Sequence, residues 1–181
     1  VDGLVLTSLV SKKRQDLKIL TRAFFANVPE IKDNMVAVAF PHDLDAQKRN
    51  IAVRKEVMDH LANDGIVILF PAGRVATARK IFGPVIEHDW NPFTAKMILK
   101  SRARVVPVFF HGQNGFAYQF LQLFSATLRQ SLLMHEIWRK LGARIEPVVG
   151  APIERDVIDG WSGTQTEFMA YLRDVTLRLG K

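Results

Sequence analysis

The chain has 181 residues, of which 48% are hydrophobic and 24% charged, and it contains no cysteine. This composition suits one domain with a hydrophobic core and excludes disorder as the main state, because too much apolar surface would be left in water. The lack of cysteine excludes disulfides, a cysteine nucleophile and cysteine-ligated metal sites. With 25 Lys and Arg against 18 Asp and Glu, the net charge of +7 favours an anionic partner: a phosphate compound, a membrane surface, an acidic carrier protein or a nucleic acid.

The start of the chain bears on its location. Residues 1–6 lack the basic region and the cleavage site of a signal peptide, and no apolar run reaches the roughly 18 residues that suggest a membrane span. The chain begins with Val1 rather than Met and enters an apolar run at once. We therefore expect residues upstream of Val1.

Short, continuous apolar runs predict the strands of the fold. Three such runs, at residues 36–40, 66–70 and 105–110, have the pattern of strands buried on both faces of a sheet. A weaker strand is predicted at residues 144–149.

Helical patterns alternate with these runs. Residues 45–63 carry an apolar stripe and end at Asn-Asp-Gly, and residues 93–101 predict a shorter helix. A capping box, Thr164-x-x-Glu167, begins a C-terminal helix. The alternation predicts a single α/β domain over residues 1–181, with a mostly parallel or mixed central sheet flanked by helices.

Polar and glycine residues follow two of the predicted strands. The segment Phe70-Pro71-Ala72-Gly73-Arg74 comes directly after the second strand, and ligands of α/β sheets bind just beyond the carboxyl ends of strands. Its turn would expose backbone N–H groups, and its arginine would bind a phosphate or a carboxylate. Taken alone, the segment is more simply interpreted as a tight turn with a solvated arginine.

Two further segments stay open to more than one interpretation. His111 and Asn114 follow the third strand and would face a ligand, although a loop with a capping asparagine is the simpler interpretation. The apolar segment 116–141 is either buried core or an acyl-chain groove and membrane-facing surface. The five histidines show no metal-ligand spacing, so nothing requires a metal.

Several short motifs occur in an order that points to one family. They are Asp2-Gly3-Leu4, Arg49-Asn50-Ile51, Phe70-Pro71-Ala72-Gly73, Val106-Pro107-Val108, Gly112-x-Asn114 and Gly150-x-Pro152-Ile153. Together they resemble the glycerolipid (lysophosphatidic acid acyltransferase-like) superfamily over nearly the whole chain. The likeness is greatest to its bacterial branch often labelled hemolysin, which includes acyltransferases of ornithine-lipid synthesis. That branch has Phe-Pro-Ala-Gly where the wider superfamily has Phe-Pro-Glu-Gly.

The resemblance implies a lipid O-acyltransferase. Such an enzyme moves a fatty acyl group from acyl-CoA or acyl-carrier protein, with no bound cofactor, to a hydroxyl of a lysophospholipid or lyso-ornithine lipid. It implies a cytoplasmic protein at the inner face of the membrane, active in phospholipid metabolism. Asp2 would orient a histidine base, and the substrate-binding residues would be Arg49, Phe70, Pro71, Ala72, Gly73, Arg74 and Asn114.

Two departures from the family pattern affect these expectations. The histidine of the His-x4-Asp motif would lie upstream of Val1, and none of the five histidines in the chain has an aspartate five positions later. Arg74 stands where the branch often has an acidic residue, which leaves the acceptor open. The alternative is a non-catalytic relative that binds membranes or lipids. Nucleic-acid binding is disfavoured, because the basic residues are dispersed rather than set in a stripe with stacking aromatics.

Overall fold

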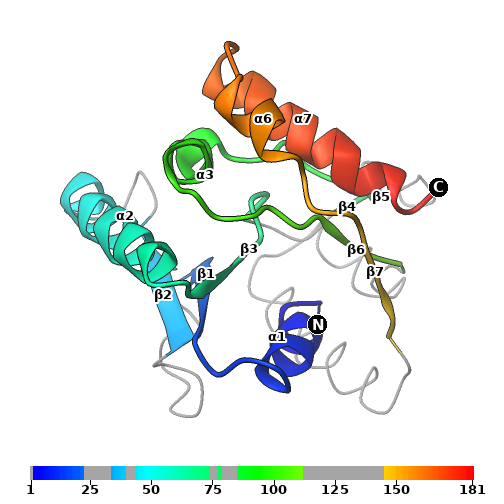
Figure 1. Cartoon of the computed structure of the whole chain (residues 1–181), viewed down its shortest axis with the longest axis horizontal. Coiled ribbons are helices and arrows are strands. Elements are labelled where there is room, and N and C mark those ends of the chain that lie inside the picture. The colour runs from blue at the N-terminus through cyan, green and yellow to red at the C-terminus, as the bar shows by residue number, and fades with distance from the viewer. Residues whose placement is uncertain (1, 23–33, 40–43, 74–76, 79–84, 112–144) are drawn as a thin grey trace.

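A computed structural model of the chain describes residues 2–22, 34–39, 44–73, 77–78, 85–111 and 145–181 (Figure 1). Its helices are α1 (Asp2–Ser11), α2 (Ala46–Ala62), the short 3-10 helix η3 (Pro92–Thr94), α3 (Ala95–Lys100), α6 (Arg155–Asp159) and α7 (Gln165–Arg178). Its strands are β1 (Leu17–Arg22), β2 (Met35–Val38), β3 (Ile66–Leu69), β4 (Thr77–Ala78), β5 (Val85–Ile86), β6 (Val108–Phe110) and β7 (Pro147–Val149).

Strand β1 is the centre of a three-stranded parallel sheet with the order β2-β1-β3. The parallel sheet was predicted, and the apolar runs at 36–40 and 66–70 correspond to its two outer strands. The central strand was missed. Lys18 interrupts its apolar run, and the ammonium group of Lys18 forms an ion pair with Glu56 of α2.

Helices cover both faces of this sheet (Figure 1). On one face Leu17 and Ile19 of β1 and Ile68 of β3 form a cluster against which Leu6 and Val10 of α1 pack. Because side chains of a strand alternate between faces, Leu20 points the other way. There it joins a cluster with residues of β2, α2 and α3: Val36, Val53, Val57 and Met97.

A second core lies between α3, α6 and α7. Its largest members, Phe168 and Met169, are fully buried, and the Trp161 ring packs against Phe168 with its centroid 5.2 Å away. The remaining members are Ala95, Ile98, Ile158 and Leu172. These helices thus form a unit that is joined to the central sheet through α3, whose Met97 belongs to the sheet-facing cluster.

The predicted third strand, 105–110, is not part of the parallel sheet. Its final residues form β6, which pairs in antiparallel fashion with β7, within the predicted strand 144–149; Val108 lies opposite Val149. Val105 makes only an isolated bridge, to Ile153. Pro107 has no N–H for a strand ladder, and β6 is half-buried rather than covered on both faces. The fold is therefore α/β, with a small parallel sheet, flanking helices and antiparallel pairs β6–β7 and β4–β5.

The predicted helices are observed with small shifts at their ends. Residues 45–63 form α2, and 93–101 form η3 and α3. None of the helices among the described residues is long and apolar enough to cross a bilayer. The predicted capping box is present at α7: the Glu167 N–H donates to Thr164 Oγ1 (3.2 Å), and the Thr164 N–H donates to Glu167 Oε2 (2.7 Å). Hydrogen bonds to the carboxylate from the Thr164 N–H and then from the Thr164 hydroxyl hold the pKa of Glu167 below its usual value.

The capping box gives a first prediction, on stability. Thr164→Ala removes the acceptor for one N–H at the start of α7 and should lower the free energy of unfolding by about 1 kcal/mol. Urea denaturation at neutral pH measures this change. The matched control Thr166→Ala, at an exposed position two residues along the same helix, should change stability by less than about 0.5 kcal/mol. Equal effects of the two variants would contradict a capping role for Thr164.

Candidate functional site

The segment Phe70–Gly73 forms a tight turn at the carboxyl end of β3. The Gly73 N–H donates to the Phe70 carbonyl (3.0 Å), and the Pro71 carbonyl accepts a bond from the Asn91 N–H (2.9 Å). Gly73 has a φ of 63°, a left-handed conformation that costs other residues about 1–2 kcal/mol. The predicted turn is therefore present, and glycine is needed at its last position.

The amino end of α1 lies against this turn, although the two segments are far apart in the chain. The Phe70 ring lies beside Gly3: a Cβ atom built on Gly3 would be 3.5 Å from Cε2 of the ring, an ordinary van der Waals distance. The direction of α1 explains the contact. The carboxyl end of α1 leads into the amino end of β1, so the helix runs antiparallel to the strands. Its ten residues span about 15 Å, the length of a short strand, and its amino end therefore lies near the carboxyl edge of the sheet.

Asp2 is the first residue of α1 and is exposed. Its carboxylate forms no hydrogen bond or ion pair with any described residue. The partial positive charge at the amino end of a helix favours a carboxylate in the first turn. This interaction explains the position of Asp2 without a catalytic role. The structure thus brings together two of the predicted blocks, Asp2-Gly3 and the Phe70–Gly73 turn.

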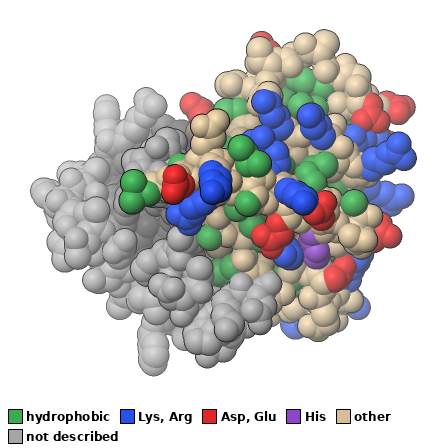
Figure 2. Space-filling view, turned by 90° about the vertical axis from the view of Figure 1, so that its left-hand side faces the viewer, with side chains coloured by type: hydrophobic (Ala, Val, Ile, Leu, Met, Phe, Trp, Pro, Cys, Tyr) green, Lys and Arg blue, Asp and Glu red, His purple; other side chains and the backbone are tan. Residues whose placement is uncertain are grey.

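Arg49 reaches the same edge of the sheet from the other face. It lies in the first turns of α2, which follows the carboxyl end of β2, whereas α1 packs on the opposite side of the sheet. Its guanidinium is exposed and unpaired among the described residues. Figure 2 shows the side of the molecule that α2 covers, where basic and acidic side chains are interspersed with apolar ones.

Asn50, beside Arg49, has a structural role that the sequence did not reveal. Its side-chain oxygen accepts a bond from the Ala39 N–H (2.9 Å), and its amide donates to the Ala39 carbonyl (2.8 Å). The amide therefore satisfies both backbone groups of Ala39, the residue after β2, as a neighbouring strand would do. This pair of bonds fixes the start of α2 at the carboxyl edge of the sheet.

The remaining predicted site residues lie outside the described part of the chain. These are Arg74, Asn114 and the apolar segment 116–141. Of the described histidines, His111 packs edge-on against Phe109, and none is bonded to Asp2. Within the described ranges no group of three His, Asp or Glu residues is arranged to hold a metal ion.

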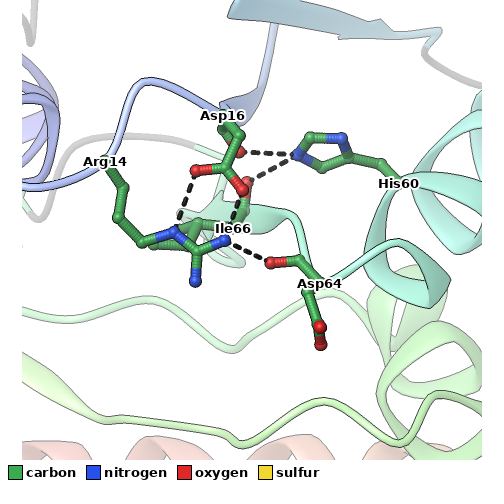
Figure 3. Close-up of polar contacts among 5 residues, drawn as sticks. All are labelled: Arg14, Asp16, His60, Asp64 and Ile66. Carbon is green, nitrogen blue, oxygen red and sulfur yellow. Dashed lines mark hydrogen bonds and ion pairs between the residues drawn. The ribbon is translucent and has the colours of Figure 1, made fainter.

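A polar cluster at the opposite, amino edge of the sheet links the segments before β1 and β3 to the end of α2 (Figure 3). Arg14 forms a two-pronged ion pair with Asp16 just before β1 and donates a further bond to the Asp64 carbonyl (2.6 Å). Nε2 of His60, near the end of α2, lies 2.9 Å from the Asp16 carbonyl and 3.2 Å from the Ile66 carbonyl. Both partners only accept, so Nε2 carries a hydrogen.

This cluster assigns His60 to structure rather than to chemistry. Its ring occupies the space above Gly65, where an added Cβ would come within 2.3 Å of Nε2. The adjacent Asp16 carboxylate has a pKa below its usual value, mainly because of the hydrogen bond from Arg14, and the same bond raises the pKa of Arg14. The cluster joins the amino ends of β1 and β3 to the end of α2.

Comparison with known proteins yields no match among family models, curated proteins or solved structures.

The ion pair of Asp16 predicts a specific pH dependence of stability. The folded-state pKa is lowered below the unfolded value of about 3.9, so the pair contributes in full above that pH. The contribution is lost as the pH falls through the folded pKa. The difference in unfolding free energy between the wild type and Asp16→Asn, followed by urea denaturation, should therefore be constant near neutral pH and shrink in acid.

Arg14→Gln provides the matching variant, because it removes the main cause of the lowered pKa. It should lose the same acid-dependent part of the stability as Asp16→Asn, and the double variant should lose little more. A difference between wild type and Asp16→Asn that stays constant down to pH values well below about 3.9 would contradict this assignment.

Gly65 gives a prediction that depends on His60. Gly65→Ala forces the imidazole away from both carbonyls and should lower the free energy of unfolding by about 1–2 kcal/mol. In a His60→Ala background the clash is absent, and because φ at Gly65 is not positive, the same change should be neutral or slightly stabilising. Urea denaturation of the four variants measures the coupling. Additive effects would show that the ring does not constrain Gly65.

Proposed function

We propose that this protein is a lipid O-acyltransferase. It transfers a fatty acyl group from acyl-CoA or acyl-carrier protein to a hydroxyl of a lipid acceptor, of the lysophospholipid or lyso-ornithine-lipid class. The observation that carries the proposal is the contact of Gly3 with Phe70. It places the acidic start of α1 beside the turn at the carboxyl edge of a parallel sheet, where α/β proteins bind their ligands.

The reaction requires a base, because the acceptor hydroxyl must lose its proton as its oxygen attacks the thioester carbonyl carbon. The carbon–sulfur bond then breaks, and the thiolate leaves and takes up a proton. In our proposal the base is a histidine five residues before Asp2, upstream of Val1. Asp2 would hold its tautomer and stabilise the imidazolium, as a carboxylate does in hydrolase triads.

The turn supplies groups that suit the charge developed in this reaction. Pro71 has no N–H, and the Gly73 N–H is already bonded within the turn. The Ala72 N–H has no partner among the described residues. It is therefore available to donate to the thioester carbonyl oxygen, which becomes negatively charged as the hydroxyl attacks. Arg49 and Arg74 would bind phosphate or carboxylate groups of the substrates, and Asn114 is the further substrate-binding residue that the family resemblance implies.

A lipid acceptor is available at a bilayer surface. We therefore propose that the protein is a peripheral component at the inner, cytoplasmic face of the membrane. The net charge of +7 suits anionic lipids and an acidic carrier protein alike.

The central test is the substitution Asp2→Asn. It keeps the size of the side chain but removes the charge that would orient the histidine, so acyl transfer should fall by at least about a hundredfold. Transfer from labelled acyl-CoA and acyl-carrier protein to a panel of lyso-lipids, followed by mass spectrometry, measures this. Circular dichroism and urea denaturation establish that the variant is folded.

Asp45→Asn is the control, since Asp45 is an exposed aspartate at the start of α2 whose side chain makes no capping bond. It should keep wild-type transfer. Intact mass and N-terminal sequencing of the natural polypeptide test the base directly, and another residue five positions before Asp2 would overturn the assignment. Unchanged turnover in Asp2→Asn would do the same. Lipid binding without any transfer would identify a non-catalytic lipid-binding relative instead.

A further inference from the structure

Helix α1 leaves part of its apolar surface in water. None of its ten residues is buried, although half of them are apolar. Leu6 and Val10, one helical turn apart, pack onto the sheet, but Leu4 and Leu9 point away from that face and are 47% and 41% exposed. One side of this helix therefore packs onto the sheet, and Leu4 and Leu9 are left only partly covered.

The surroundings of this surface are apolar at one end and basic at the other. Phe70, which is 39% exposed, lies against Gly3 and extends the apolar surface to the candidate site. Beyond the other end of the helix, Lys12 and Lys13 are exposed, and neither is paired with a described carboxylate. Apolar side chains next to free lysines form the combination that binds anionic lipid surfaces.

We propose that the surface formed by Leu4, Leu9, Phe70, Lys12 and Lys13 is the membrane-docking surface of the protein. Its occupant is an anionic bilayer: the leucines and the phenylalanine enter the headgroup boundary, and the lysines contact lipid phosphates. The inference rests on the proposed function, because a membrane docked here would deliver a lipid acceptor directly to the turn at Phe70–Gly73.

The size of the surface favours a membrane over a second copy of the chain. A helix about 15 Å long and about 10 Å wide presents on the order of 150 Å², whereas a stable protein interface needs about 800 Å² from each partner. A bilayer requires no such area, because a few inserted side chains and neighbouring cationic groups suffice for reversible binding. The positive charge beside the apolar surface also matches anionic lipids and would repel an identical copy.

Sedimentation with lipid vesicles tests the proposal. The full chain should bind vesicles of phosphatidylglycerol and phosphatidylcholine, bind pure phosphatidylcholine much less, and lose affinity as salt screens the lysines. Leu4→Gln/Leu9→Gln keeps good helix formers and should lower the partition coefficient about tenfold, because each leucine is only partly available for burial. Lys12→Gln/Lys13→Gln should lower it by about fivefold for each lysine removed.

Matched controls come from α2 and from Leu44, two residues before its start. Leu44 and Ile51 are even more exposed, at 91% and 60%, so Leu44→Gln/Ile51→Gln removes as much exposed apolar surface elsewhere. Lys48→Gln/Lys55→Gln removes two exposed lysines from the same helix. Both controls should bind vesicles within about twofold of the wild type. Circular dichroism establishes that every variant is folded.

The outcomes separate this inference from the proposed function. The docking surface would be overturned if the wild-type protein does not bind anionic vesicles, or if the α1 and α2 variants lose vesicle binding equally. Either result would do so even if acyl transfer to a monomeric short-chain acceptor is observed. Vesicle binding that depends on α1, without transfer to any acceptor, would overturn the enzyme and keep the surface. A concentration-dependent dimer in analytical ultracentrifugation that Leu4→Gln/Leu9→Gln abolishes would assign the surface to a second copy and contradict the proposal.

Discussion

The arrangement of the chain depends on β1, the strand that is hydrogen-bonded on both sides. It pairs in parallel with β2 and β3, and its alternating side chains anchor different helices on the two faces of the sheet. Leu17 and Ile19 contact the layer of α1, and Leu20 contacts that of α2 and α3. An insertion or deletion of one residue in β1 would exchange these faces and separate both helices from their partners.

Parallel pairing also determines where the polar groups gather. Because the strands run the same way and α1 and α2 run against them, the amino ends of both helices reach the carboxyl edge of the sheet. Asp2 and Arg49 therefore lie at one edge, on opposite faces, with the Phe70–Gly73 turn beside the first. The opposite edge carries the cluster around Asp16 and His60, in which Arg14 pairs with the Asp16 carboxylate and His60 bonds to backbone carbonyls. Structural bonding and the candidate chemistry are thus separated along the strands.

The sequence predicted those features that local patterns encode. The helices α2 and α7, the capping box and the turn after β3 depend on neighbouring residues, and all were found in place. The strand β1 was missed because Lys18 looks like a solvent residue until Glu56 of α2 is beside it. The roles of Asn50 and His60 were missed for the same reason, since their partners, Ala39 and Asp16, come from other elements. Likewise, no local pattern shows that residues 105–110 pair outside the central sheet, with β7 and Ile153.

Helix α1 shows how one short segment meets two different demands. Packing on the sheet requires only one face of the helix, and Leu6 and Val10 satisfy it. Leu4 and Leu9 leave 47% and 41% of their surface in water, where polar residues would favour solubility more. An exposed apolar surface beside a candidate site often marks a contact with a ligand or a membrane. Helix α1 is not enclosed by the described core, and its free side adjoins the turn that we propose binds a lipid. In our proposal, the exposed apolar surface of α1 serves binding rather than stability.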